Sequence, residues 1–291
     1  MKRIFIPVLL LVLTVACKSN SSNSSKDSLN KISKSSSKPS EAEILALIKK
    51  FKPNIQGVWV KADYISEIAK TNSPLKAFTK AGNITTLIIK PELIRGDSLL
   101  IDVGYGNHEG GNLIIKFKKG HLANAILAYN PGNNINDGFY ELNYAVKKDT
   151  TLTLFTFDKD KKPVDSTRYV RVFNNRSSKE LGEGTDYIVN KTLISGNYIL
   201  TDSLNRTERI SFTNDGNVSG FSDFKTFYIA IDFTTPPNNL DEIIFVLNSK
   251  KQKSFGYTIT ADTLKLFETT YTKDSLQLVL GRLKYKLVRQ K

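Results

Sequence analysis

The chain has 291 residues, of which 40% are hydrophobic, and 42 Lys and Arg oppose 28 Asp and Glu to give a formal charge of +14. This is the composition of a globular protein with one large domain or two small ones, and it excludes wholesale disorder. One cysteine excludes an internal disulfide framework and a zinc site built on several thiolates, and two histidines leave little for a histidine-rich metal centre.

The first 16 residues are organised like an export signal. Met1-Lys2-Arg3 is a positively charged start, and a mainly apolar run of 13 residues follows from Ile4 to Ala16. A membrane-spanning helix needs about 20 apolar residues. The run is therefore too short to span a bilayer, and its length is that of a signal peptide.

Ala16 stands immediately before the only cysteine of the chain, and this pair resembles the lipobox of bacterial lipoproteins. In that family the signal is cut before the cysteine, which is diacylated, so the resemblance implies lipidation of Cys17 and attachment to a membrane. Thr14 departs from the family, which prefers Leu three residues before the cysteine. An ordinary signal peptide followed by a bystander cysteine is the alternative.

Residues 17–39 are predicted to be a flexible tether. The 22 residues from Lys18 to Pro39 include ten Ser and only two apolar side chains, Leu29 and Ile32. Such a segment cannot bury enough apolar surface to offset the entropy of ordering it. Lys18, rather than Asp, follows the cysteine, and by resemblance to the sorting of enteric lipoproteins this favours the outer membrane.

The remainder is predicted to be mostly β-structure after a short helix. Ser40 and Glu43 form a capping box, and apolar residues at helical spacing from Ile44 to Phe51 predict a helix that ends near Pro53. The later β-branched and aromatic runs lie between turn signals, with no long helices alternating, which indicates antiparallel barrels or sandwiches. These runs are Ile84–Ile89, Ser98–Val103, Asn112–Phe117, Leu152–Phe157, Arg168–Phe173, Gly196–Leu200, Arg209–Thr213, Phe227–Phe233, Glu242–Leu247, Phe255–Thr260, Leu264–Thr269, Ser275–Leu280 and Lys284–Arg289, with a hairpin at Asn214–Asn217.

Two features indicate that the β-structure is a tandem of similar units. Each half begins with a glycine–aromatic strand, Gly57-Val58-Trp59 and Gly196-Asn197-Tyr198, and each approaches its end through Asp-Thr, a short apolar strand and a hairpin. We therefore expect an all-β fold of two antiparallel barrels. Residues 40–173 hold the helix and the first barrel, 174–190 the linker, and 191–291 the second barrel.

The G-x-W sequence after a short helix resembles the calycin superfamily, which includes the lipocalins and bacterial lipocalin-like proteins. The resemblance implies two up-and-down barrels of about eight strands, each with one small-molecule cavity. In lipocalins the tryptophan closes the barrel floor, and a basic residue of the final strand packs over its ring. The resemblance thus implies that Trp59 packs against Arg168 or Arg171, and Tyr198 against Arg289.

The glycine-rich segment from Gly104 to Asn112 is one candidate ligand site. Four of its nine residues are glycines, which allow close approach of a partner. The side chains of Tyr105, Asn107, His108 and Glu109 are suited to a sugar or another polar ligand. A plain hairpin between two strands is the alternative.

The segment from Asp63 to Phe78 is the second candidate. It is predicted to be helical with a break at Ser73-Pro74, and it presents Tyr64, Ile68 and Phe78 on its apolar face. We expect it either to cover an apolar cavity at the barrel mouth, with these three side chains touching the ligand, or to pack on the outside of the barrel.

Catalytic and metal chemistry have little support. His108 and His121 lack the i,i+4 spacing of paired ligands, so neither a metal site nor a cofactor is expected. No G-x-S-x-G elbow is present. A carboxylate pair for glycoside hydrolysis is set by position in space, so the sequence selects none, and we expect no enzymatic activity.

Nearly half of the charge belongs to the leader and the tether. Residues 1–40 hold seven basic residues and one acidic residue, which leaves 35 against 27, or +8, for residues 41–291. Basic clusters with aromatic platforms are absent, so no nucleic-acid partner is expected. The leading hypothesis is a non-catalytic, lipid-anchored envelope protein that binds a small apolar or amphipathic ligand in a barrel. A structural or assembly accessory that binds another envelope protein is the alternative, and a glycan hydrolase is a third.

Overall fold

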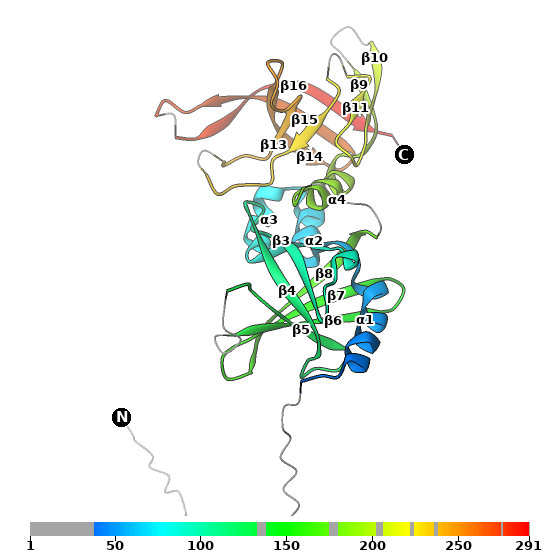
Figure 1. Cartoon of the computed structure of the whole chain (residues 1–291). Helices are drawn as coiled ribbons and strands as arrows, with labels where there is room; N and C mark the ends of the chain where they lie inside the picture. The colour runs from blue at the N-terminus through cyan, green and yellow to red at the C-terminus, as the bar shows by residue number, and fades with distance from the viewer. Residues whose placement is uncertain are drawn as a thin grey trace, which may run out of the picture. The chain divides into compact units, whose positions relative to one another are not determined.

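The computed structural model describes residues 38–132, 138–174, 180–201, 206–221, 224–235, 238–274 and 276–290. The predicted signal peptide, Cys17 and nearly all of the predicted tether lie outside these residues. The described part is mostly β-structure with four short α-helices, and it contains a closed eight-stranded antiparallel barrel and a second eight-stranded antiparallel sheet (Figure 1).

Helix α1 (Glu41–Ile55) confirms the predicted entry helix. The Ser40 hydroxyl accepts a hydrogen bond from the Glu43 backbone, and the Glu43 carboxylate accepts one from the Ser40 backbone, so the capping box is complete. The helix runs two residues past Pro53. It buries Phe51 and Ile55 in the core of the barrel.

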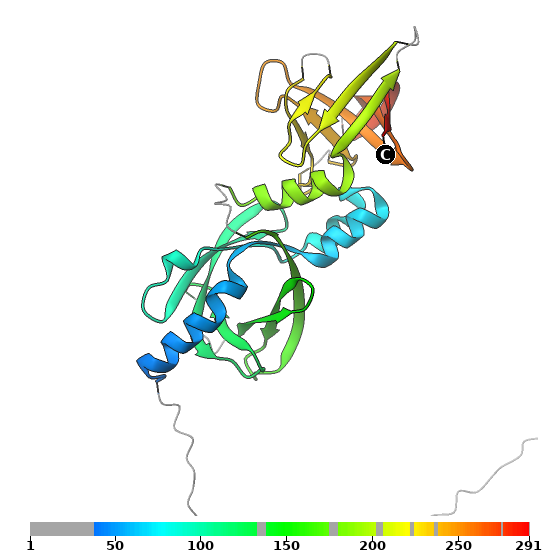
Figure 2. The same ribbon diagram turned by 90° about the vertical axis from the view of Figure 1, so that its right-hand side faces the viewer.

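The first barrel is an up-and-down arrangement in which each strand pairs with the next, and β8 pairs back onto β1 (Figure 2). Its core is a cluster of buried side chains that includes Trp59, Leu87 and Leu113. Closure leaves no exposed strand edge in this sheet. The strands are β1 (Gly57–Lys61), β2 (Ile84–Ile89), β3 (Ser98–Tyr105), β4 (Glu109–Lys119), β5 (Ala125–Tyr129), β6 (Phe139–Val146), β7 (Thr150–Phe157) and β8 (Pro163–Phe173), with a short 3₁₀ turn at Pro91–Leu93.

The β1–β2 connection contains two helices, α2 (Ala62–Thr71) and α3 (Pro74–Ala81), and the predicted break at Ser73-Pro74 is confirmed. Ser73 caps α3, because its hydroxyl accepts a hydrogen bond from the Lys76 backbone at 3.0 Å. The buried side chains of both helices belong to the same apolar cluster as the second sheet.

Helix α4 (Glu183–Leu193) occupies much of the segment expected to be a linker. Asn190, Val189 and Leu193 of this helix are buried. Residues 183–190 of the predicted linker are therefore helical, and Val189 among them packs into the core of the second β-unit. Residues 175–179 of the predicted linker lie outside the described residues.

The second β-unit has the strand order β11-β10-β9-β16-β15-β14-β13-β12. Its two edge strands, β11 and β12, are only two and three residues long, and a single bridge between Asn217 and Thr226 joins their flanks. A second closed barrel was expected, and the structure shows a sheet whose edges meet through this one bridge. The strands are β9 (Gly196–Thr201), β10 (Thr207–Phe212), β11 (Val218–Ser219), β12 (Phe227–Ile229), β13 (Glu242–Phe245), β14 (Lys253–Thr260), β15 (Thr263–Tyr271) and β16 (Leu278–Arg289).

Trp59 and Arg171 form the floor of the first barrel. The Trp59 ring is fully buried, and its indole N–H donates to the Ile55 carbonyl at the end of α1, at 2.8 Å. Arg171 is its cross-strand partner on β8, and the guanidinium carbon lies 4.4 Å from the ring centroid. The same guanidinium donates to the Asn54 carbonyl at 2.6 Å. Arg168, the other expected partner, is exposed.

The second β-unit repeats this floor residue by residue. The Tyr198 hydroxyl donates to the Ile194 carbonyl just after α4, at 2.7 Å, as Trp59 does four residues from its own acceptor. Arg289 is the cross-strand partner of Tyr198, lies 5.2 Å from its ring centroid, and donates to the Leu193 carbonyl at 2.6 Å. A helix end, a glycine–aromatic strand and a final-strand arginine are thus joined in the same way in both halves.

Candidate functional site

The three residues expected to line a cavity under the β1–β2 connection are placed elsewhere. Tyr64 and Ile68 are fully buried in the core of the second β-unit. Phe78 packs edge-on against Phe233, with 5.5 Å between ring centroids. None of the three lines any cavity described below. The connection is held in this place by Asp241, which accepts hydrogen bonds from the Ser73 hydroxyl at 2.5 Å and the Leu75 backbone at 2.9 Å.

The glycine-rich segment is a tight hairpin between β3 and β4. Three residues connect Tyr105 to Glu109, and the first two, Gly106 and Asn107, have positive φ, 56° and 62°, as the central residues of a turn with mirror-image backbone angles. The turn contacts the chain after β12, because the Asn107 amide donates to the Ile231 carbonyl at 3.4 Å and His108 Nδ1 lies 2.7 Å from the Asp232 carboxylate. The hairpin turn is therefore packed against the segment that follows β12.

A cavity of about 160 Å³ lies beside this hairpin. Asn107, His108 and Glu109 line it, together with the segment that leads into α4. Hydrogen bonding to Asp232 raises the pKa of His108 above its ordinary value of 6.5. Tyr105 lines a different cavity.

The two histidines have separate partners and do not approach a shared ligand. His121 Nδ1 lies 2.7 Å from the Glu141 carboxylate on the first barrel, whereas His108 pairs with Asp232. Within the described residues no three His, Cys, Asp or Glu side chains converge closely enough to hold a metal ion.

The interior of the first barrel leaves little room for a ligand near its floor. The floor half is occupied by the buried side chains packed around Trp59. At the opposite end lies a cavity of about 230 Å³, whose lining includes Tyr105, Tyr140 and Asp165. This cavity is small and partly polar.

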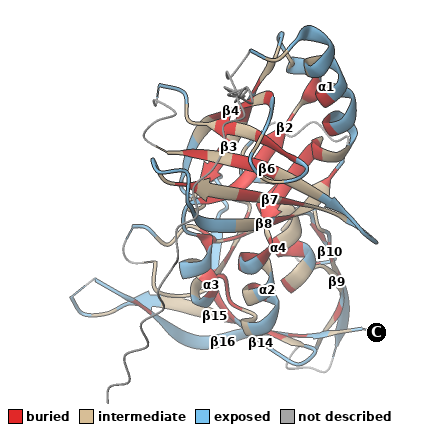
Figure 3. Ribbon diagram, turned by 90° about the horizontal axis from the view of Figure 1, so that it is seen from below, coloured by how far each residue is buried: buried red, intermediate tan, exposed pale blue. Residues whose placement is uncertain are grey.

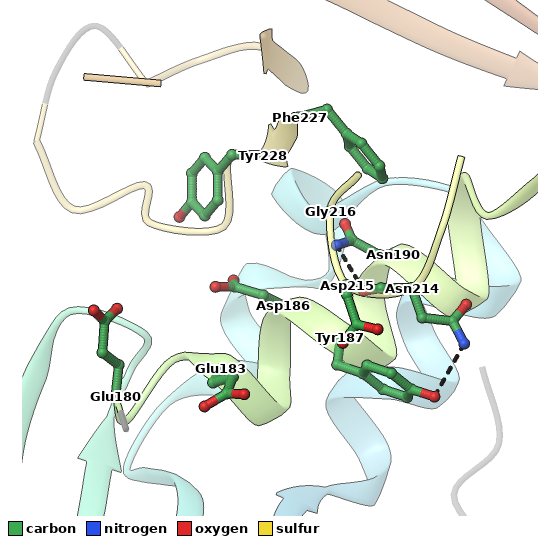
Figure 4. A pocket seen from close by; sticks show the side chains of 10 residues that line it. All are labelled: Glu180, Glu183, Asp186, Tyr187, Asn190, Asn214, Asp215, Gly216, Phe227 and Tyr228. Atoms are coloured by element: carbon green, nitrogen blue, oxygen red, sulfur yellow. Dashed lines mark hydrogen bonds between the residues drawn. The ribbon is translucent and has the colours of Figure 1, made fainter. Parts of the chain in front are cut away.

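A cavity of about 450 Å³, the acidic pocket, lies between α4, the β10–β11 turn and β12 (Figure 4). Four carboxylates and three aromatic rings line it, and the amides of Asn190 and Asn214 complete the wall. The Asn190 amide donates to the Asn214 carbonyl, and the Asn214 amide donates to the Tyr187 hydroxyl, both at 3.1 Å. The lining residues are Glu180, Glu183, Asp186, Tyr187, Asn190, Asn214, Asp215, Gly216, Phe227 and Tyr228.

Asp186 is the unusual titrating group of this pocket. Burial, with a smaller repulsion from Glu180 and Glu183, raises its pKa from 3.8 to about 7. A carboxyl group that titrates near neutral pH in an open cavity marks a candidate site for acid–base chemistry.

Replacing Asp186 by Asn is expected to stabilise the protein above pH 7. The folded-state pKa lies above the unfolded value of 3.8, so the wild type loses stability as pH rises between 3.8 and about 7, and the Asn variant does not. The gain at pH 8 is at most about 4 kcal/mol and vanishes below pH 4. Urea unfolding at several pH values measures it, and equal stability of the two proteins at pH 8 would contradict the shifted pKa.

A second large cavity, the aromatic–lysine pocket, lies in the second β-unit at the end of β14–β16 opposite the Tyr198 floor. It has a volume of about 350 Å³ and is lined by Phe224, Lys253, Ser254, Phe255, Glu268, Thr269, Lys284 and Tyr285. Its wall is one side of a cluster of rings, in which Phe224 stacks on Phe245 at 4.4 Å and Phe255 meets Tyr285 edge-on at 5.7 Å.

The polar rim of the aromatic–lysine pocket has an excess of positive charge. Lys284 lies 3.7 Å from the Glu268 carboxylate, which Arg282 also contacts at 3.3 Å. Lys253 has no ion pair among the described residues. Two lysines and one carboxylate thus line the opening, and the carboxylate is shared with Arg282 outside the pocket.

Sequence reasoning missed both large cavities. The signal for the aromatic–lysine pocket was the density of rings between Phe221 and Phe233, where five of 13 residues are Phe or Tyr. The signal for the acidic pocket was the spacing of Glu180, Glu183 and Asp186, which places carboxylates along one side of a helix start.

No helix within the described ranges is both long and apolar enough to span a bilayer. Comparison with known proteins adds no family assignment: no family model, curated protein or solved structure matches the chain.

Proposed function

We propose that this protein is a non-catalytic, lipid-anchored protein of the cell envelope, held at the outer membrane through Cys17, and that it binds a small amphipathic ligand in the aromatic–lysine pocket. The observation that carries the proposal is the composition of that cavity. It combines an aromatic wall with a rim of positive charge inside a β-unit. Small-molecule sites are concave and mostly apolar, with a few polar groups that fix orientation.

The lining specifies the chemistry of the ligand. An apolar chain or ring packs against Phe224, Phe255 and Tyr285, where it is removed from water. The rim places Lys253 and Lys284 beside the exposed end of the ligand, so that end is anionic. Ligand binding is thus assigned to the second β-unit, while the packed floor half of the first barrel stabilises the molecule.

We also assign the second β-unit to the same calycin-like architecture as the first barrel. Support comes from the matching floors, in which Trp59 with Arg171 and Tyr198 with Arg289 make equivalent contacts. The bridge between Asn217 and Thr226 supports closure of this sheet through its short edge strands.

A titration with three eight-carbon amphiphiles tests the binding site. Octanoate, octanol and octylamine share one chain and differ in the charge of the head group. We expect octanoate to bind most tightly and octylamine most weakly in a titration followed by NMR. The double variant Lys253→Ala/Lys284→Ala is expected to bind octanoate about tenfold more weakly and octanol unchanged, because a hydrogen bond to a charged group contributes about 1.5–3 kcal/mol.

The matched control is Lys147→Ala/Lys148→Ala, two exposed lysines in the β6–β7 turn of the first barrel. These substitutions remove the same charge and leave the pocket intact, so octanoate affinity stays at the wild-type value. Equal weakening by both double variants reflects net charge alone and refutes the site, as does an octanoate affinity that neither variant changes.

An assembly role is the second candidate, favoured by the packed floor half of the first barrel, which leaves little room for a ligand. In that case the protein purified from its own envelope carries a stoichiometric protein partner and no small ligand.

Glycan hydrolysis is favoured only by Asp186, whose pKa of about 7 suits a general acid. Hydrolysis of peptidoglycan or oligosaccharide that disappears in Asp186→Asn would establish that activity and overturn the non-catalytic proposal.

A further inference from the structure

The acidic pocket lies between two segments of the chain that polar contacts join. Helix α4 forms one wall, and the β10–β11 turn with β12 forms the other (Figure 4). The buried Asn190 amide joins the two walls through the Asn214 carbonyl. The Phe227 backbone N–H donates to the Gly216 carbonyl at 2.7 Å, which holds the turn against β12. The cavity therefore has walls whose backbones are tied to one another.

Helix α4 is itself fixed along its length. Every one of its residues except Lys191 is buried or half-buried (Figure 3). The Thr185 hydroxyl lies 2.9 Å from the Thr86 hydroxyl on β2, and Val189 and Leu193 belong to the core of the second β-unit. The carboxylates that α4 presents to the cavity are therefore held on a rigid support.

The four carboxylates of the lining come from both walls. Glu180, Glu183 and Asp186 belong to α4 and the residues just before it, and Asp215 belongs to the opposite wall. No Lys, Arg or His is among the described residues that line the cavity. Within the same described residues the Asp186 carboxylate has neither a hydrogen bond nor an ion pair. The charge of Asp186 is therefore not compensated by a cation of this lining.

Compensation of the α4 dipole does not account for this arrangement. An acidic residue in the first turn of a helix is stabilised in its charged form by the positive end of the dipole, which lowers its pKa. The pKa of Asp186 is instead raised to about 7, first by burial and then by repulsion from Glu180 and Glu183. Asp215 lies in the β10–β11 turn, so the start of α4 does not explain its position. A bound cation offsets both the repulsion and the lost hydration of these carboxylates.

The size and the lining of the cavity favour an organic cation over a metal ion. No three carboxylates of the described ranges converge closely enough to coordinate a metal. The volume of about 450 Å³ lies within the range of small-molecule sites. Three rings, those of Tyr187, Phe227 and Tyr228, line the same cavity. They offer apolar surface for methylene groups and aromatic faces for an ammonium group.

We propose that the acidic pocket binds an alkyl polyamine, with one ammonium group at Asp186, a second at Asp215 on the facing wall, and the methylene chain against the ring of Tyr228. Hydrogen bonds between an ammonium group and a carboxylate are charge-assisted and stronger than neutral ones. The acidic pocket shares no lining residue with the aromatic–lysine pocket and takes a ligand of the opposite charge. The two sites are therefore independent of one another.

Isothermal titration calorimetry of the full chain at low ionic strength tests the site with three probes. Cadaverine, pentylamine and 1,5-pentanediol share a five-carbon chain and carry two, one and no ammonium groups. We expect cadaverine to bind about tenfold more tightly than pentylamine, which corresponds to about 1.4 kcal/mol for the second charged contact. No binding of pentanediol is expected.

Cadaverine binding is expected to tighten about tenfold between pH 6 and pH 8. With a pKa of about 7, Asp186 passes over this range from about one-tenth to about nine-tenths ionised, while the amines stay protonated. Asp186→Asn is expected to abolish this rise, which separates Asp186 from the other titratable groups around it. These groups are Glu180, Glu183, Asp215, Tyr187, Tyr228 and, from α2, Tyr64.

Asp186→Asn/Asp215→Asn is expected to weaken cadaverine binding at pH 8 at least tenfold. The matched control is Asp149→Asn/Asp160→Asn, which removes two exposed carboxylates from turns of the first barrel and leaves the affinity at the wild-type value. Urea unfolding of the same samples shows that both double variants are folded.

Three results overturn the proposal: equal weakening by the two double variants, no measurable binding of cadaverine, and binding of pentanediol as tight as that of cadaverine. Tighter binding of Ca²⁺ than of cadaverine also overturns it and assigns the cavity to a metal ion. Octanoate affinity is expected to be the same in Asp186→Asn/Asp215→Asn and the wild type, because the aromatic–lysine pocket is untouched.

Discussion

Replacing Trp59 by Ala is expected to lower the free energy of unfolding by about 3–5 kcal/mol, the range found for large buried rings. The substitution empties the floor of the first barrel, where the ring is fully buried. It also leaves the Ile55 carbonyl without its indole donor and removes the aromatic face beneath Arg171. Urea unfolding followed by far-ultraviolet circular dichroism measures the loss.

Tyr271→Ala is the control for this prediction. Tyr271 is also an aromatic residue on a strand, but it is 59% exposed, so the change in unfolding free energy is expected to stay within about 0.5 kcal/mol. A decrease in the free energy of unfolding of less than about 1 kcal/mol for Trp59→Ala would show that the Trp59 floor does not stabilise the barrel.

Arg289→Met is expected to destabilise the second β-unit by about 2–3 kcal/mol. The guanidinium donates to the Leu193 carbonyl and to the Tyr198 hydroxyl, both at 2.6 Å, and joins the final strand to the end of α4. Met keeps much of the apolar volume and removes all of these donors. Calorimetry is expected to show a lower transition temperature for the variant.

Arg282→Met on the same strand is the control. Its side chain is 74% exposed and makes one 3.3 Å ion pair with Glu268. A surface ion pair of this kind contributes about 0–1 kcal/mol. If the two arginine variants unfold at the same temperature, the contacts of Arg289 do not stabilise the second β-unit, and the prediction is contradicted.

Most of the secondary structure follows from local patterns. The capping box at Ser40 and Glu43 predicts the start of α1, and the β-branched run Ile84–Ile89 coincides with β2. Strands β1 and β9 begin at Gly57 and Gly196, as their glycine–aromatic sequences predict. Both glycines have a positive φ, which other residues rarely adopt. Local chemistry alone determines these features.

Features that depend on distant parts of the chain could not be predicted. The apolar face of α2 and α3 is visible in the sequence, but it is buried in the core of the second β-unit, where Asp241, more than 160 residues away, accepts hydrogen bonds from Ser73 and Leu75. The contact between the edges of the second sheet involves its two shortest strands, whose patterns are too brief to detect.

The candidate sites illustrate the same limit. Their polarity predicts His108 and Asn107 as ligand-binding residues, yet in the fold their side chains form hydrogen bonds with Asp232 and the Ile231 carbonyl. The aromatic–lysine pocket joins Phe224, Lys253 and Lys284, which lie on three separate segments. The sequence therefore identifies polar and apolar segments, but it does not show which of these segments contact one another in the fold.

Native mass spectrometry of the protein purified from its own envelope tests the central proposal most directly. The proposal predicts a polypeptide that begins at Cys17 with the added mass of its acyl chains, together with one non-covalent amphiphile. That amphiphile is expected to be absent from Lys253→Ala/Lys284→Ala and present in Lys147→Ala/Lys148→Ala. An unacylated chain without a small ligand, or one that carries only a stoichiometric protein partner, would contradict it.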